Sequence, residues 1–237
     1  RRATRDALAQ AVCDRLDEML LQGTTTAEVK SGYGLDTDSE VRSLEAIEEA
    51  GRRHPMTLVP TFLGAHEVPP ELREDREAYL RLLVDEMIPL VAQRKLARFC
   101  DVFCEPDVFS VEEARRILSA ARKQGLGVRV HADELAEGGG AELAAEMGAR
   151  SADHLVHVAP GGMRALAPAR CAATVLPAAA FYLRLGRFAP ARALIEAGVP
   201  LALATDANPG GGLSPSIPFA MTVGCFAMGL SLEEAIA

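Results

Sequence analysis

Seven short runs of apolar and β-branched residues alternate along the chain with segments of helical periodicity. Such runs are typical of parallel strands buried on both faces, and their alternation with helices predicts a parallel sheet with crossover helices. The runs cover residues 24–30, 57–63, 100–104, 126–131, 152–156, 172–176 and 200–205. We therefore predict an α/β fold, and a (β/α)8 barrel without its first strand fits seven strands preceded by a helix better than a doubly wound sheet.

Several helices between these runs carry start and stop signals. Residues 37–40 and 110–113 both have the pattern of a capping box, in which a hydroxyl and a carboxylate satisfy the first free amides of a helix. Gly51 and Gly125 predict helix ends, and the glycines at 138–140 predict the start of another helix.

No linker, low-complexity tract or internal repeat interrupts this alternation. We expect one barrel domain over residues 1–237, with strands two to eight of the barrel. Both ends are expected to be truncated. Arg1 opens a helical pattern without a cap, and the helix predicted to begin at residues 231–234 stops at Ala237.

Composition narrows the class of partner. The hydrophobic fraction of 49% is ample for a core, and the formal net charge of −8 argues against a nucleic acid or a membrane surface as partner. No apolar run reaches the ~18 residues of a membrane span, and the first residues do not resemble a signal peptide. We expect a soluble, cytoplasmic protein that acts on a small molecule. The spacing of the five scattered cysteines is more typical of thiols buried in strands than of a metal-binding cysteine motif, and we assign them no function.

Side chains capable of chemistry stand at the ends of several predicted strands, where ligands of α/β folds bind. Asp206 and Asn208 precede the glycine run 210–212, which would let the backbone approach a ligand closely, although an Asx turn uses the same residue types. His131 prolongs a strand and is followed by Glu134, a spacing that allows one group to bind and the other to transfer protons.

The remaining histidines differ in their positions. His54 stands at a helix exit, and we expect it to be solvated. His66 follows a strand, a place that fits a surface residue and a site residue equally. Within residues 153–157 the period of a strand would put His154 and His157 on opposite faces, so only one of them should face a pocket.

An imidazole and a carboxylate from different strands are common ligands of catalytic zinc or iron, which needs about three protein ligands and an open position. His131 and Asp206 supply two such ligands. The others would have to come from the missing first strand.

Taken together, these segments resemble the imidazolonepropionases, a family of the amidohydrolase superfamily. The resemblance covers essentially the whole chain and is specific as a set. It rests on residues 25–35 (TTAEVKSGYGL), 62–66 (FLGAH), 101–105 (DVFCE), 131–134 (HADE), 153–154 (DH) and 205–210 (TDANPG).

The resemblance implies a metal-dependent hydrolase of histidine degradation, which opens 4-imidazolone-5-propanoate to N-formimidoyl-L-glutamate. It implies one zinc or iron ion, held by two histidines of a His-x-His on the first strand, by His131 and by Asp206. The substrate-binding residues would be Tyr33, His66, Glu134, Asn208, Gly210 and Gly211. The catalytic residues would be Glu134, His154, Asp206 and His66, with Glu134 our first choice as the general base.

The chain departs from the family pattern in three respects. It contains no His-x-His, it lacks the nearby arginine that the family uses on the substrate, and it lacks the family's small flanking β-domain. We therefore expect this segment to be inactive by itself. The alternatives are another amidohydrolase, such as a nucleobase deaminase, or a catalytically silent barrel. The sequence leaves the choice between zinc and iron open, and it allows a homodimer.

Overall fold

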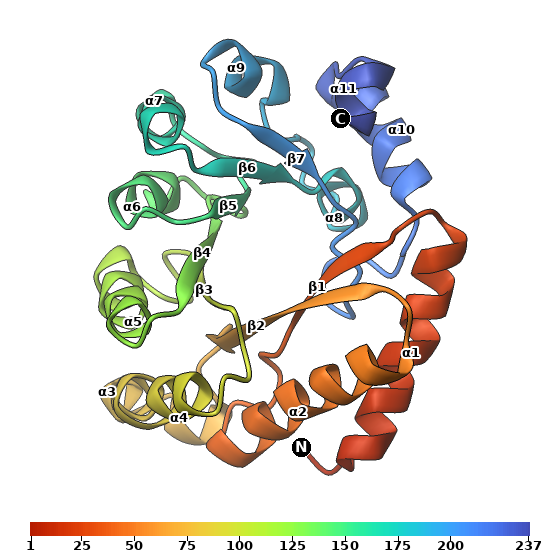
Figure 1. Cartoon of the computed structure of the whole chain (residues 1–237). Helices are drawn as coiled ribbons and strands as arrows, with labels where there is room; N and C mark the ends of the chain where they lie inside the picture. The colour runs from red at the N-terminus through yellow and green to blue at the C-terminus, as the bar shows by residue number, and fades with distance from the viewer. The chain divides into compact units, whose positions relative to one another are not determined.

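The chain divides into two units in the computed structural model, which describes residues 1–237 (Figure 1). The first unit comprises Arg1–Phe103 and Asp107–Val128, and the second comprises Cys104–Pro106 and Arg129–Ala237. Within each unit, parallel strands alternate with helices, as the sequence predicts.

The first unit contains the elements up to β3, together with α5. The elements are α1 (Arg5–Leu21), β1 (Thr26–Lys30), α2 (Thr37–Arg53), β2 (Thr57–Ala65), the short helix η1 (Pro70–Leu72), α3 (Arg76–Arg81), the π-helical η2 (Leu82–Met87), α4 (Ile88–Gln93), β3 (Phe99–Cys104) and α5 (Val111–Lys123). Strand β2 pairs in parallel with both of its neighbours, Thr57 opposite Thr26 of β1 and Thr61 opposite Phe99 of β3.

The second unit continues the same pattern. Its elements are β4 (Gly127–Ala132, of which the first two residues belong to the first unit), α6 (Gly140–Glu146), β5 (Ser151–His154), α7 (Pro160–Ala169), β6 (Ala172–Val175), α8 (Pro177–Tyr182), α9 (Ala191–Glu196), β7 (Leu201–Leu203), α10 (Ile217–Met228) and α11 (Leu232–Ile236). Strand β5 pairs in parallel with β4 and β6, and β6 pairs in parallel with β7.

The strands follow one another in the order of the chain, from β1 to β7. This order, with helical crossovers between parallel strands, is that of a (β/α)8 barrel, of which the chain has seven strands. The predicted fold class is therefore confirmed. All seven predicted strands are present, and no predicted boundary differs from the observed one by more than two residues.

Two expectations about helix starts are wrong. The first helix has a cap, because the Thr4 hydroxyl at the start of α1 accepts a hydrogen bond from the amide of Ala7 at 3.2 Å. Residues 37–40 do not form a capping box, because Asp36 is the N-cap of α2 and its carboxylate accepts a hydrogen bond from the amide of Ser39 at 2.8 Å. Glu40 is fully buried and instead accepts hydrogen bonds from the amides of residues 34 and 35, at 2.7 and 3.0 Å. Its carboxylate thus holds the loop before the helix.

The other helix signals give a mixed result. Residues 110–113 form the predicted capping box of α5, and Gly125 follows the end of that helix with φ of 84°. Gly51 does not end α2, which continues to Arg53. The two arginines of this last turn bond back to Glu49, and basic side chains are favourable at a helix C-terminus.

Each unit has its own apolar core. In the first unit Phe62, Tyr79 and Leu83 are fully buried, and the Tyr79 hydroxyl donates a hydrogen bond to the carbonyl of Gly64 at 2.7 Å. In the second unit the largest buried side chains are Leu143, Leu155 and Leu166. The expectation of buried strand thiols is confirmed for Cys100 and Cys104 of β3, which are free and buried, but not for Cys13 and Cys225, which lie in helices.

A tight turn follows β1 at Ser31, Gly32 and Tyr33. Gly32 has φ of 123°, and a Cβ atom added to it would lie 2.7 Å from the carbonyl oxygen of Leu63. The Ser31 hydroxyl accepts a hydrogen bond from the Leu63 amide at 3.1 Å. Because the turn lies so close to β2, this position requires a glycine.

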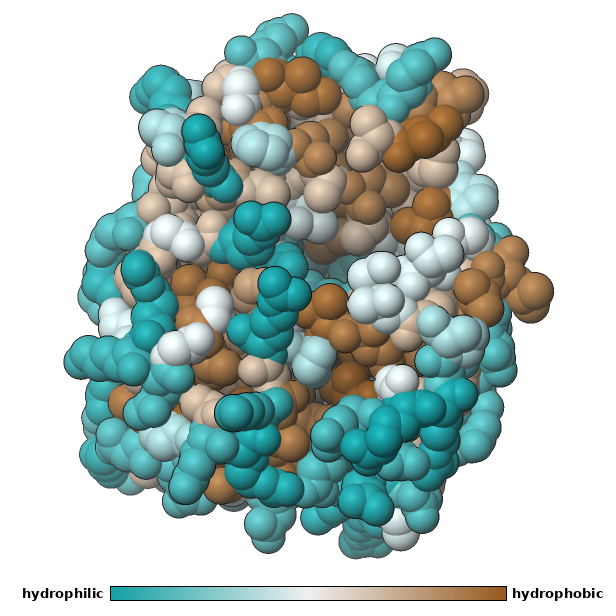
Figure 2. All heavy atoms as spheres, in the orientation of Figure 1, coloured by the Kyte–Doolittle hydropathy of each residue, from teal (hydrophilic) through white to brown (hydrophobic).

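The surface carries one notable apolar region in the second unit. Figure 2 shows hydrophobic side chains gathered over α10, where Phe226 is 90% exposed. The rings of Phe181, Tyr182 and Phe219 contact one another nearby, with centroids 5.8 to 6.3 Å apart.

No helix is both long enough and apolar enough to cross a membrane.

Candidate functional site

Strand β5 is polar where a buried strand is normally apolar. All four of its residues are buried, yet Ser151, Asp153 and His154 carry polar side chains. The Ser151 hydroxyl donates to a carboxylate oxygen of Asp153 at 2.7 Å and accepts from the guanidinium of Arg129 at 2.7 Å. Because buried polar groups are costly without partners, this chain of hydrogen bonds fixes the Asp153 carboxylate in one position.

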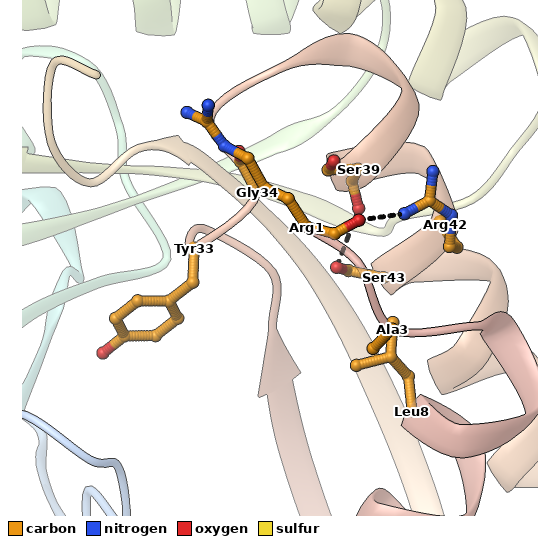
Figure 3. A pocket seen from close by; sticks show the side chains of 8 residues that line it. All are labelled: Arg1, Ala3, Leu8, Tyr33, Gly34, Ser39, Arg42 and Ser43. Atoms are coloured by element: carbon orange, nitrogen blue, oxygen red, sulfur yellow. Dashed lines mark hydrogen bonds between the residues drawn. The ribbon is translucent and has the colours of Figure 1, made fainter. Parts of the chain in front are cut away.

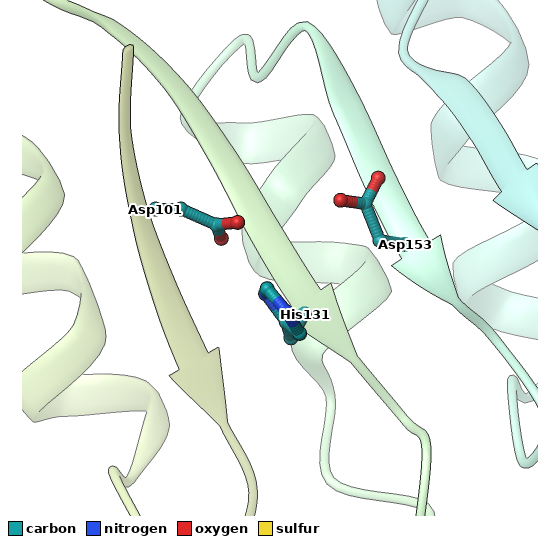
Figure 4. Close-up of side chains that lie close together, drawn as sticks. All are labelled: Asp101, His131 and Asp153. Atoms are coloured by element: carbon teal, nitrogen blue, oxygen red, sulfur yellow. The ribbon is translucent and has the colours of Figure 1, made fainter. Parts of the chain in front are cut away.

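His131, at the end of β4, lies beside Asp153. The two residues are register partners in the parallel pair of β4 and β5 (Figure 4), and their possible ligand atoms lie within 4.8 Å of each other. His131 is 8% exposed, and its ring centroid is 5.2 Å from that of His154. An imidazole beside a carboxylate is a donor set that suits a divalent metal. Asp153 was not among the predicted site residues, although its place directly before His154 in a buried strand was a usable signal.

Glu134 is a second buried carboxylate of this cluster, beside Asp153. One of its oxygens lies 3.4 Å from Nδ1 of His154. Burial raises the pKa of Glu134 to about 7; the charge of His131 opposes this shift, and the charges of Asp206 and Glu105 add to it. A carboxylate with a pKa near neutrality can both accept and release a proton under physiological conditions.

Left-handed backbone recurs where strands of the second unit end. Asp133, His154 and Asp206 have φ of 52°, 73° and 50°. Aspartate and histidine tolerate this conformation better than most residues, and such strain is commonly found at functional sites.

At the end of β5 the turn of the backbone interrupts strand alternation, which allows His154 as well as Asp153 to lie near His131. His157 lies elsewhere, with Nδ1 3.4 Å from the guanidinium of Arg187. Of His154 and His157, only His154 therefore joins the cluster.

Two buried carboxylates hold the loop that follows β4. Glu105 accepts hydrogen bonds from the successive amides of residues 134–136, at 2.6, 3.1 and 3.2 Å. Asp133 accepts three more at the start of α6, from the amides of Gly138, Gly140 and Ala141. Neither residue has a role that was predicted from the sequence, although Glu105 follows β3 directly and so occupies a strand end.

The loop after β7 contains Asp206 and Asn208. Asp206 is partly buried and lies three residues beyond the end of the strand. The Asn208 side chain donates to the carbonyl of Asp206 at 2.8 Å and accepts from the amides of Gly210 and Gly211 at 2.7 and 2.5 Å. These bonds form the Asx-type turn that the sequence analysis gave as the alternative to a ligand-binding loop. A role of the loop in substrate binding stays a prediction.

The first unit brings together Tyr33 and His66. Their ring centroids are 4.9 Å apart, and His66 also stacks on Phe103 at 5.7 Å. Tyr33 is 55% exposed. Figure 3 shows its ring pointing away from the other residues that line a cavity of about 110 Å³ near Arg1. The side chain of Tyr33 is thus held beside His66 rather than directed into that cavity.

The interior of the first unit also contains a charged network that the sequence analysis did not anticipate. Asp101, on β3 (Figure 4), is fully buried, and its carboxylate lies 2.5 Å from the ammonium group of Lys30. The same ammonium lies 3.3 Å from Glu28, which accepts a hydrogen bond from the Thr61 hydroxyl at 2.5 Å. A carboxylate this deeply buried requires such a partner.

The expectation for His54 is wrong. Its ring is only 5% exposed, with Nε2 3.1 Å from a carboxylate oxygen of Asp17 and Nδ1 accepting from the amide of Met56 at 3.2 Å. Asp17 belongs to α1, whose packing against α2 covers the ring. His54 is therefore a structural residue.

Comparison with known proteins identifies a family and named relatives. A family model described as "Amidohydrolase family" matches residues 1–232. The chain is 49% identical over 234 residues to an imidazolonepropionase of Alkaliphilus metalliredigens, covering 99% of this chain and 56% of the relative. It is 52% identical over 241 residues to an imidazolonepropionase of Symbiobacterium thermophilum, covering 100% of this chain and 57% of the relative. The chain thus spans little more than half the length of these curated relatives.

Solved structures resemble the chain in fold. A guanine deaminase from C. acetobutylicum with bound guanine has a TM-score of 0.70 at 17% identity, with 98% of this chain and 60% of that chain covered. A 5-methylcytosine deaminase from Klebsiella pneumoniae liganded with phosphonocytosine has a TM-score of 0.74 at 16% identity, with 96% and 60% covered. At such identities the likeness concerns the fold alone.

Proposed function

Because the chain belongs to the amidohydrolase family, we propose that it is the barrel domain of an enzyme that hydrolyses the cyclic amide of 4-imidazolone-5-propanoate to N-formimidoyl-L-glutamate. The observation that carries this proposal is the identity of 49 to 52% to two imidazolonepropionases over essentially the whole chain. The deaminases of similar fold are only 16 to 17% identical. A cytoplasmic location and a homodimer are parts of the same proposal.

The reaction requires water to attack a ring carbonyl, after which the carbon–nitrogen bond breaks and the nitrogen takes up a proton. Glu134 takes the proton from water in this proposal, since it is the buried carboxylate whose pKa lies near 7. His154, 3.4 Å from Glu134, assists by accepting or passing on that proton. Glu134 or His154 then gives the proton to the leaving nitrogen, which balances the step.

A divalent metal, zinc or iron, would be held on this chain by His131 and Asp206. Asp153 is a further possible ligand, because its carboxylate lies within 4.8 Å of a ring nitrogen of His131. When bound, it supplies Lewis-acid polarisation of the carbonyl and lowers the pKa of water to about 7. Asp206 would also serve as a second proton acceptor. Among the remaining site residues, His66 polarises the carbonyl or holds the ring, and Tyr33 donates a hydrogen bond to the substrate. Asn208, Gly210 and Gly211 bind the carboxylate end of the substrate.

The proposed base makes activity dependent on pH. We expect kcat/KM to rise with pH through about 7, because Glu134 must be ionised to accept a proton and burial raises its pKa to about 7. Ionisation of this buried group costs stability as pH rises from the ordinary carboxyl range towards 7, since the folded state binds the proton more tightly. A pH–rate profile measured with the metal-loaded protein tests the expected rise in kcat/KM. An activity independent of pH between 5.5 and 8 would contradict it.

A substrate panel tests the proposed function. The intact protein should convert imidazolone propanoate to N-formimidoyl-glutamate, identified by mass spectrometry, at a kcat/KM at least about 10³-fold above that for guanine, adenine or 5-methylcytosine, because a site built for one substrate leaves polar groups unpaired with another. Ammonia release from a nucleobase at the higher kcat/KM would favour the deaminase alternative. Metal binding without turnover of any of these compounds would favour the silent barrel.

A further inference from the structure

We propose that Glu105 is a positioning residue for the reaction, which holds Glu134 in place by binding the backbone of the loop that carries it. This inference rests on the proposed function, in which Glu134 takes a proton from water. In this proposal Glu105 itself contacts neither the substrate nor the metal.

The hydrogen bonds of Glu105 all go to one short segment. One carboxylate oxygen accepts from the amides of Glu134 and Leu135 at 2.6 and 3.1 Å, and the other accepts from the amide of Ala136 at 3.2 Å. Three successive amides converging on one anion form a nest, and charge-assisted hydrogen bonds are stronger than neutral ones. Glu105 is 3% exposed and lies 29 to 31 residues away in sequence, so this is a tertiary anchor and not a local turn.

The opposite end of the loop is anchored separately. Asp133 accepts hydrogen bonds from Gly138 and Gly140 at 2.9 and 3.2 Å, which fixes the start of α6. Between the two anchors, the side chains of Leu135 and Glu137 are exposed, whereas Glu134 is buried. The anchors therefore determine where the carboxylate of Glu134 lies relative to His154.

The alternative is that Glu105 only stabilises the fold, and two substitutions separate the readings. In Glu105→Gln the amide oxygen keeps the bonds to Glu134 and Leu135, but the NH2 group faces the amide of Ala136 and loses the third bond. In Glu105→Ala all three bonds are lost. If Glu105 positions Glu134, kcat should fall in steps, with the value of the glutamine variant between those of the parent and the alanine variant.

Turnover is measured with imidazolone propanoate and the intact, metal-loaded enzyme. We expect kcat to fall by about 10²-fold in Glu105→Ala with KM within about threefold of the parent, because a displacement of about 1 Å in a reacting group has this cost. Metal content should stay unchanged. Glu113→Gln is the matched control, since this carboxylate also accepts a backbone hydrogen bond, from Ser110 at 2.9 Å in the capping box of α5. Its kcat should equal that of the parent.

Amide hydrogen exchange supplies a readout that does not depend on activity. In Glu105→Ala the amides of residues 134–136 should exchange faster than in the parent, while those of β4 keep their protection. Unchanged protection of these amides, or equal kcat in the parent and both Glu105 variants, overturns the inference. If the parent does not turn over imidazolone propanoate, the proposed function fails, and the exchange result alone then decides whether Glu105 anchors the loop.

Discussion

Replacing Glu134 by glutamine will lower kcat by about 10² to 10⁴-fold, the usual contribution of a positioned general base. Glutamine has nearly the same size and can still accept a hydrogen bond, but it cannot take up a proton. The substitution also removes a buried group whose pKa is raised to about 7, so the folded protein should be no less stable at pH 8 than the parent. Steady-state kinetics, with metal content measured on the same samples, tests the expectation.

Glu137→Gln provides the matched control for this experiment. Glu137 lies in the same loop but is exposed, so the same chemical change there should leave kcat within about twofold, as is usual for surface substitutions. Near-normal turnover of Glu134→Gln with metal still bound would show that another group is the base. His154 and Asp206 are then the residues to test next.

The largest expected effect on stability comes from Gly32→Ala. The positive φ of 123° costs an alanine about 1 to 2 kcal/mol, and its Cβ would lie 2.7 Å from the carbonyl oxygen of Leu63, which adds about 1 to 3 kcal/mol of overpacking. We expect a total loss of about 3 kcal/mol in the free energy of unfolding. Urea unfolding followed by circular dichroism measures this loss.

Gly125→Ala separates the two contributions. Gly125 also has positive φ, 84°, but a Cβ atom there would meet nothing within 4 Å. It should therefore cost only the conformational part, about 1 to 2 kcal/mol. Equal losses in the two variants would mean that the turn moves away from β2 at little cost. The tight packing of this turn would then not explain its glycine.

The strands were predictable because their signal is local. A strand buried on both faces is a continuous apolar run, and the alternation with helices then gives the fold class. The capping box at residues 110–113 was predictable for the same reason, since both of its hydrogen bonds lie within one turn.

Where the sequence analysis failed, the partner lay outside the local pattern. Glu40 has the spacing of a capping box, but its carboxylate accepts from the amides of residues 34 and 35 in the preceding loop. His54 looked solvated at a helix exit, but α1 covers it through Asp17. Neither contact can be read from spacing within a helix.

In the candidate site, too, local signals were predictable from the sequence and contacts between distant residues were not. His131, Glu134 and Asp206 were predicted as site residues because each stands at or just beyond the end of an apolar run. The role of Glu105 depends on amides 29 to 31 residues further along the chain, which only the folded backbone brings to it. The proximity of Asp153 to His131 depends on strand register, which the sequence of either strand leaves undefined.

The left-handed backbone of Asp133, His154 and Asp206 limits which amino acids these positions can accept. Asparagine, aspartate, histidine and glycine adopt such φ values readily, whereas β-branched residues do so only with strain. A library that randomises these three codons completely would therefore contain many members with a strained backbone at these positions. At positions 154 and 206, a library restricted to those four residue types would sample metal-binding and proton-transferring side chains with little added backbone strain. Position 133 should stay aspartate, because its carboxylate also accepts the hydrogen bonds that fix the start of α6. The shape of the chain at its strand ends thus defines the small set of chemistries among which this scaffold can change by single substitutions.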